Sequence, residues 1–189
     1  MEIFLMDAAP GPCNTMQDLE TWGTAPGNAL RSIGAVMFDP HSNEIGDEFY
    51  MNITDESCLK VGLTRDPDTV KWWGRSENVG AASVFAKDPI PLREVGEAFN
   101  AWWRKNRSIF VWSQGANFDQ PLWEAAMRAV GLGVPWKFWD SRCTRTAYDM
   151  GGFNPRSIKR KGIHHYALDD AKHQTLCVQA AYANVRRVP

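Results

Sequence analysis

The sequence lacks long apolar runs and any strong excess of charge of one sign. No apolar stretch approaches the length of about 18 residues that a membrane-spanning helix needs. The 21 basic and 22 acidic residues give a formal net charge of −1, so no overall basic field attracts a polyanion. We therefore predict no membrane span, and binding to a nucleic acid would require a local basic patch or metal ions.

Cysteine is scarce and scattered. The four cysteines, Cys13, Cys58, Cys143 and Cys177, include no pair at the C-x-x-C spacing. This pattern argues against a zinc-binding cysteine cluster or a disulfide framework and favours free thiols in a reducing cytoplasm. The first residues lack the basic stretch that is typical of an export signal, so the sequence predicts a cytoplasmic protein.

The composition that is present is ordinary for a globular protein. Apolar residues make up 44% and charged residues 23% of the 189 positions. A chain of this length folds most simply as one domain that buries roughly 70% of its unfolded surface. We therefore expect a single domain over residues 1–189. The nine tryptophans either fill its core or form a surface that stacks on bases.

Hydrophobic periodicity and turn residues predict an α/β fold with a mixed, mostly five-stranded sheet flanked by helices, its first three strands antiparallel. Strands are expected at residues 3–6, 29–38, 45–53, 108–112 and 136–141. Helices are expected at residues 54–63, 66–73, 92–104, 121–130, 142–150 and 167–183. Residues 153–164 are expected to form a basic loop, which either contacts phosphates or is simply solvated.

Two carboxylates stand close together in Asp18-Leu19-Glu20-Thr21. Side chains alternate along an extended segment, so Asp18 and Glu20 project from the same face. Like charges held this close repel each other unless a cation lies between them. Oxygen ligands of this kind suit Mg²⁺ or Mn²⁺.

Residues 7–17 separate this acidic pair from the apolar run at 3–6. They contain two prolines and a glycine, and without them the strand would lead directly into the pair. We therefore expect residues 7–17 to be an insertion that weakens the support of Asp18. Asp7 competes for the role of first metal ligand, but only Asp18 has a carboxylate partner two positions later.

Three further polar residues stand at a strand end or a helix start. Asp119 follows the strand expected at 108–112, and His165 and Asp170 lie at the start of the last helix. Such positions line a ligand crevice in α/β sheets. With Asp18 and Glu20, these residues could hold two divalent ions about 4 Å apart, the arrangement that cleaves phosphodiesters. His165 could take a proton from water, with His164 as the alternative histidine.

These residues form three short motifs that carry a family resemblance. Asp18-Leu19-Glu20-Thr21, Phe118-Asp119 and His165-x-Ala167-x-x-Asp170 occur in that order. Together they resemble the exonuclease motifs of the DEDDh branch of the ribonuclease-H-like superfamily. The stretches 32–36, 69–73 and 111–119 are similar to a subgroup of small bacterial and phage 3′–5′ exoribonucleases. The resemblance implies the ribonuclease-H-like fold and a bacterial or phage-infected host cytoplasm.

The resemblance also implies roles for individual residues. Asp18, Glu20 and Asp170 would ligate metal directly, Asp119 would complete a second site, and His165 would be the general base. The implied cofactors are two Mg²⁺ or Mn²⁺ ions. The 3′-terminal nucleotide would be bound by a set of neighbouring side chains: Leu19, Thr21, Trp73, Asn117 and Phe118.

We therefore expect a metal-dependent 3′–5′ exonuclease that releases nucleoside 5′-monophosphates from single-stranded ends. RNA is favoured over DNA by the subgroup resemblance. Two alternatives stay open: a 3′–5′ exodeoxyribonuclease of proofreading or phage recombination, and a catalytically weakened nucleotide- or nucleic-acid-binding module. Many relatives are dimers, which makes a homodimer a further expectation by analogy.

Overall fold

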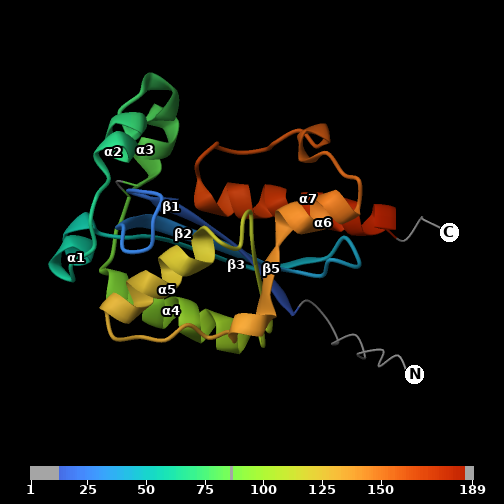
Figure 1. Cartoon of the computed structure of the whole chain (residues 1–189), viewed down its shortest axis with the longest axis horizontal. Coiled ribbons are helices and arrows are strands. Elements are labelled where there is room, and N and C mark those ends of the chain that lie inside the picture. Colours follow the sequence, from blue (N-terminus) through green and yellow to red (C-terminus); the bar gives the residue numbers. More distant parts are fainter. Residues whose placement is uncertain (1–12, 86, 186–189) are drawn as a thin grey trace.

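The computed structural model describes residues 13–85 and 87–185, and its centre is a five-stranded sheet of order β3-β2-β1-β4-β5 (Figure 1). β1, β2 and β3 pair antiparallel, and β4 and β5 continue the sheet in parallel with β1. The predicted mixed sheet with three antiparallel strands is therefore confirmed. The strands are β1 Asn14–Thr21, β2 Leu30–Phe38, β3 Ile45–Asn52, β4 Phe110–Ser113 and β5 Ser141–Cys143.

The strand that carries Asp18 begins at Asn14, which corrects the expectation of an interrupting insertion. Asn14 pairs with Phe38 of β2 on one side and with Phe110 of β4 on the other. A central strand covered on both faces buries every side chain, and residues 14–17 are all buried. These four residues therefore lead directly into Asp18. The rest of the expected insertion, Asp7 and the strand expected at 3–6 lie outside the described residues.

Helices cover both faces of the sheet (Figure 1). On one face, α4 (Leu92–Lys105) and α5 (Asp119–Ala129) pack against β2 side chains such as Ile33. On the other, α6 (Thr144–Met150) and α7 (Ala167–Val185) pack against the β2 residue Val36 and its neighbours. Because both faces are covered, β1 and β2 are almost entirely buried and form a rigid base for polar groups at their ends.

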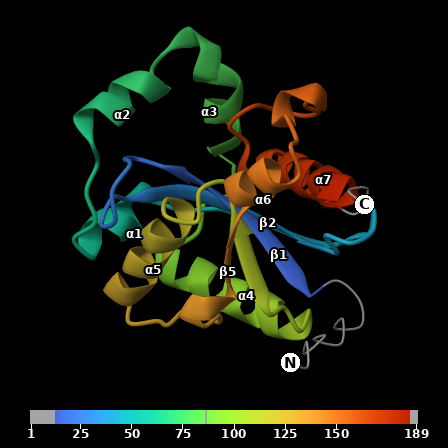
Figure 2. The same ribbon diagram turned by 45° about the vertical axis from the view of Figure 1, so that its right-hand side comes forward.

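A group of short helices stands beside the sheet and away from the main layers (Figure 2). It comprises α2 Pro67–Trp73, the 3₁₀ turn Ser76–Asn78 and α3 Val79–Phe85, whereas the preceding helix α1 Asp55–Lys60 packs on the main core through Cys58. The Arg31 guanidinium joins this group to β2, because it lies 4.1, 4.4 and 4.0 Å from the ring centres of Trp22, Trp73 and Phe85. Such cation–π contacts stabilise a charge that is partly withdrawn from water.

Most predicted helices match the observed ones within a few residues, but two regions differ. The strand expected at 136–141 is wrong, because Phe138–Asp140 forms a 3₁₀ turn and β5 begins only at Ser141. The Asp140 carboxylate accepts the Lys137 N–H at 3.2 Å and closes this turn. α3 was not predicted. In the described part of the chain, no helix has both the length and the apolar character needed to cross a membrane.

Candidate active site

A pocket of about 850 Å³ opens where β1 ends, between the starts of α5, α6 and α7 and the helix α2. The four predicted acidic residues and His165 all line it, together with the alternative histidine, a residue of the predicted basic loop and further side chains. The lining includes Asp18, Glu20, Asp119, His165 and Asp170, and also Trp72, Arg145, Arg160, His164 and Gln174.

Three carboxylates meet at the centre of this pocket. One oxygen from each of Asp18, Glu20 and Asp170 lies within 4.8 Å of the others. Asp119 joins them through β1, because its Oδ1 accepts the Leu19 N–H at 3.2 Å. The structure therefore brings together the four acidic residues that were expected to meet, from β1, α5 and α7.

A glycine in β2 explains how α7 reaches the acidic pair of β1. Gly34 pairs directly with Asp18, and a Cβ atom on Gly34 would overlap the backbone of Ala167 and Leu168. With no side chain at this position, the first turn of α7 packs against β2. Asp170 is thereby held over β1 next to Asp18.

Burial gives these carboxyl groups unusual acidities. Glu20, Asp119 and Asp170 are only 6%, 3% and 7% exposed. Burial raises the pKa of Asp119 to about 7 and also raises the pKa of Asp170. The pKa values of Asp18 and Glu20 lie well above the ordinary range, because burial and the neighbouring carboxylates act in the same direction.

These features fit a divalent cation. Four converging, largely buried carboxyl groups are costly in their charged form unless a positive charge compensates them. Carboxylate oxygens are also the ligands that Mg²⁺ and Mn²⁺ prefer. The donor set therefore matches the implied metals in both chemistry and charge.

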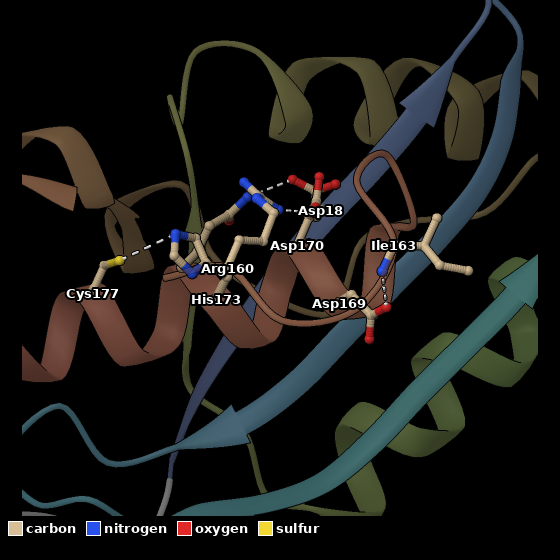
Figure 3. Close-up of polar contacts among 8 residues, drawn as sticks. Asp18, Arg160, Ile163, Asp169, Asp170, His173 and Cys177 are labelled. Carbon is tan, nitrogen blue, oxygen red and sulfur yellow. Dashed lines mark hydrogen bonds and ion pairs between the residues drawn. The ribbon is translucent and has the colours of Figure 1, made fainter. Parts of the chain in front are cut away.

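Two side chains of the protein already contact the cluster (Figure 3). The Gln174 amide donates to Asp18 Oδ1 at 2.6 Å, and the Arg160 guanidinium forms an ion pair with Asp170. Gln174 lies one helical turn after Asp170 on α7. Arg160 comes from the predicted basic loop, so at least this residue of the loop faces the pocket.

His165 occupies the wall opposite β1 and has a left-handed backbone, with φ of +62°. Its ring packs edge-on against Trp72, with ring centres 4.7 Å apart, and lies 3.8 Å from the ring of His164. Burial, with smaller contributions from His164 and Arg160, lowers the pKa of His165 to about 4. The imidazole is therefore neutral near pH 7, the form that can accept a proton.

The residues expected to bind the terminal nucleotide fall into two groups. Leu19, Thr21 and Phe118 line the pocket, and so does Trp73. Trp73 is only 6% exposed and its indole N–H donates to the Thr21 carbonyl at 2.8 Å, so it forms a fixed wall. Asn117 is exposed and is not among the residues that line the pocket.

Arg145 of α6 lines the same pocket and was missed by sequence reasoning. Its guanidinium lies against Gly115, where a Cβ would come within 3.1 Å of Nη1 and where φ is +101°. Among the described residues, no carboxylate lies within salt-bridge distance of Arg145. A single arginine in a short helix carries no sequence signal. Its place in the pocket becomes visible only in the structure, where Arg145 packs against Gly115.

Comparisons with known proteins identify the family and the fold of this chain. The sequence profile described as 3′-5′ exoribonuclease Rv2179c-like domain matches residues 13–182. No curated protein sequence matches the chain.

Among solved structures, E. coli Exonuclease I in complex with a dT13 oligonucleotide is similar, with a TM-score of 0.66 and 12% identity over 93% of this chain. The nuclease domain of 3′hExo, a DEDDh family member bound to rAMP, has a TM-score of 0.59 and 14% identity, and 92% of each chain is covered. This chain spans only 42% of the Exonuclease I chain. At these identities the likeness concerns the fold, which is that of DEDDh exonucleases.

Proposed function

The chain belongs to the family of 3′-5′ exoribonuclease Rv2179c-like domains, and from this premise we propose that it removes nucleoside 5′-monophosphates from the 3′ end of single-stranded RNA. The observation that carries the proposal is the convergence of Asp18, Glu20, Asp119 and Asp170 in one pocket with His165 opposite them. A 3′–5′ exonuclease is the activity of the family, whereas the RNA preference and the residue roles are our inference.

The carboxylates would hold the metal ions. Asp18, Glu20 and Asp170 would bind one divalent cation, and Asp119 would complete a site for a second. When bound, Mg²⁺ or Mn²⁺ neutralises the carboxylates and stabilises charge on the attacking and leaving oxygens of the phosphodiester. The raised pKa values support this assignment, because burial and mutual repulsion make the charged carboxylates costly without a compensating positive charge.

His165 would act as the general base. A water oxygen bonds to phosphorus while the bond from phosphorus to the 3′-oxygen of the preceding nucleotide breaks. One proton of the water passes to the neutral imidazole, and the leaving 3′-oxygen takes up a proton from solvent. The low pKa of His165 supports this role, since the ring is unprotonated at the pH of the cell.

Arg145 would position the substrate phosphate. Among the described residues its guanidinium forms no ion pair within salt-bridge distance, although its charge acts on Asp119, whereas Arg160 is paired with Asp170. Arginine binds phosphate oxygens through a planar pair of N–H donors, and such bonds are stronger than neutral ones. Trp72, Leu19 and Phe118 would contact the terminal base.

A binding module without activity was one expected alternative, and its main argument has been removed. That alternative depended on residues 7–17 interrupting the support of Asp18, but residues 14–17 are part of β1. The exodeoxyribonuclease alternative stays open as an outcome of the test. A homodimer, a bacterial or phage cytoplasmic location and a single domain remain predictions.

The test uses 5′-labelled single-stranded RNA and DNA of equal sequence, incubated with Mg²⁺, Mn²⁺ or EDTA. We expect a ladder that shortens from the 3′ end, that needs metal and that forms faster on RNA, because a 2′-hydroxyl contact distinguishes the two sugars. Asp119→Asn should abolish it, whereas Asp149→Asn, the same change at an exposed position of α6, should not. Faster DNA cleavage would favour the exodeoxyribonuclease, and no cleavage by the folded protein would overturn the proposal.

A further inference from the structure

A second group of possible metal ligands overlaps the acidic cluster. One ligand atom from each of His164, His165 and Asp170 lies within 4.8 Å of the other two. This group offers two imidazole nitrogens and one carboxylate oxygen, whereas the group of Asp18, Glu20 and Asp170 offers oxygens alone. The two groups share Asp170 and differ in the class of metal that they suit.

The backbone at His165 is what brings both imidazoles to one side. Consecutive side chains of an extended chain point in opposite directions. At His165 the φ of +62° turns the chain, and the rings of His164 and His165 lie 3.8 Å apart at an angle of 35°. Left-handed backbone is uncommon in residues other than glycine, and it persists where the surroundings fix it.

The surroundings of this turn do fix it. The Asp169 carboxylate accepts the Ile163 N–H at 2.8 Å (Figure 3), and the Asp170 N–H donates to the Tyr166 carbonyl at 3.0 Å. A Cβ on Gly162, where φ is +82°, would overlap the Asp169 carboxylate. The histidine loop is thus tied to the same turn of α7 that carries Asp170.

The two histidines differ in their exposure. The ring of His165 is half-buried against Trp72 and Trp73, with ring centres 4.7 and 5.9 Å away. His164 is exposed, so the group is open to solvent on the side away from those tryptophans. An ion can therefore reach the ligands without entering through the acidic cluster.

We propose that His164, His165 and Asp170 form a binding site for a borderline-soft divalent ion, best matched by Zn²⁺. Imidazole nitrogens and a carboxylate oxygen are ordinary zinc ligands, and three of them leave a fourth tetrahedral position for water. Mg²⁺ binds oxygen ligands and retains its own waters, so it does not compete well for two imidazoles. The site therefore selects a different metal from the acidic cluster beside it.

Binding at this site has a consequence that rests on the proposed exonuclease function. A zinc ion on His165 occupies the ring nitrogen that would accept a proton, and on Asp170 it takes a ligand from the acidic cluster. Zn²⁺ therefore inhibits the enzyme even when Mg²⁺ is in excess, and it does so through His164, a residue outside the proposed catalytic set.

Arg160 competes with the zinc ion for Asp170. Its guanidinium is paired with Asp170, and an ion that binds this carboxylate must displace it. Removing the arginine should therefore tighten zinc binding, whereas removing His164 should weaken it. A loss of folding would weaken zinc binding in both variants. Opposite changes in zinc affinity in the two variants therefore indicate the site itself.

The experiment titrates the metal-free, full-length protein with ZnCl₂ in the presence of a coloured chelator, without substrate. His164→Asn should weaken Zn²⁺ binding by at least about 10-fold. Even the mutation of a residue that only hydrogen-bonds to a metal ligand lowers metal affinity by about this factor. Arg160→Gln should tighten it. The matched control is His173→Asn, because the His173 ring lies 3.6 Å from the Cys177 sulfur and could offer a competing soft pair.

Each possible result of this titration either supports or overturns the proposed zinc site. A loss of zinc binding in His164→Asn with normal binding in His173→Asn supports the site. Equal binding in wild type and His164→Asn, or a loss only in His173→Asn, overturns it. Turnover in Mg²⁺ alone is measured separately, so a protein that binds zinc through His164 but cleaves no RNA would contradict the proposed function and leave the metal site standing.

Discussion

The pocket has two walls that are built in different ways. The carboxylate wall consists of Asp18, Glu20, Asp119 and Asp170, and regular secondary structure at the centre of the sheet holds it. The histidine wall consists of His164, His165 and Trp72. A loop with a left-handed residue forms it, and ring contacts and one carboxylate cap hold it in place.

Because of this difference, we expect substitutions in the two walls to reduce activity in different ways. Changes in the carboxylate wall remove charge but leave the backbone in place, because β1 is paired on both sides. Changes in the histidine wall move its imidazoles, because ring packing and the Asp169 carboxylate, rather than strand pairing, hold the loop. The first kind should abolish chemistry with little loss of folding, and the second should reduce the rate by misplacing His165.

The largest effect is expected when the carboxylate wall loses one charge. Glu20→Gln keeps the shape of the side chain and removes a metal ligand, so the cleavage rate should fall by about 10²-fold or more. Glu94→Gln, the same change at an exposed position of α4, should leave the rate unchanged. Single-turnover cleavage of RNA measures both. A Glu20→Gln rate near that of wild type would remove this residue from the metal site.

The next effect comes from loosening the histidine wall. Trp72→Ala removes the ring against which His165 packs, and kcat should fall by about 10- to 100-fold, since small displacements of catalytic groups have effects of this size. Trp72→Phe retains an aromatic contact and should recover most of the rate. If both variants cut equally well, or equally badly, the packing of Trp72 on His165 is not what positions the base.

A smaller effect is expected for the phosphate contact. Arg145→Ala should raise KM by about 10-fold with a smaller change in kcat, because a charged hydrogen bond of about 1.5–3 kcal/mol is lost from the bound substrate. Arg145→Lys should be intermediate. Arg156→Ala, at an exposed position that does not line the pocket, is the control. A kcat loss without a KM change in Arg145→Ala would contradict phosphate positioning.

The smallest effect concerns the stability of the metal-free protein. The pKa of Asp119 is higher in the folded chain, at about 7, than its ordinary value of 3.8, so the folded state binds more protons. The Asp119 contribution to stability is therefore fully present below about pH 4 and is lost as the pH rises to about 7, whereas the lowered pKa of His165 acts in the opposite direction between about pH 4 and 6.5.

Denaturant unfolding in EDTA at several pH values tests this. Asp119→Asn should flatten the decrease, and added Mg²⁺ should restore stability at pH 8, because metal binds only the folded state. An Asp119→Asn variant whose stability follows the same pH profile as wild type would show that burial of Asp119 does not set the charge state of the cluster.

The carboxylate wall could be predicted from sequence because its information is local. Asp18 and Glu20 follow the period of a strand, and Asp119 and Asp170 stand at helix starts. The strand ahead of Asp18 was misread, since the prolines and the glycine at residues 10–12 and the competing apolar run at 3–6 masked the pairing of residues 14–17 with β2 and β4.

His165 and its alternative His164 were predicted from the motif at the start of the last helix, but the packing of the histidine wall depends on contacts between distant residues and could not be predicted. Sequence does not show that Trp72 packs on His165 while Trp73 is buried against Phe85. Nor does it show that Gly115 leaves room for Arg145. Residues 136–141 were predicted as a strand and include the apolar Phe138 and Trp139, yet Phe138 is 84% exposed in a turn.

The central claim is the proposal that this pocket cleaves single-stranded RNA from a free 3′ end. The most direct measurement compares linear and circular single-stranded RNA of the same sequence with Mg²⁺, with the products identified by mass spectrometry. The account predicts nucleoside 5′-monophosphates from the linear RNA and no cleavage of the circle. Cleavage of the circular RNA, or products that carry a 3′-phosphate, would contradict it.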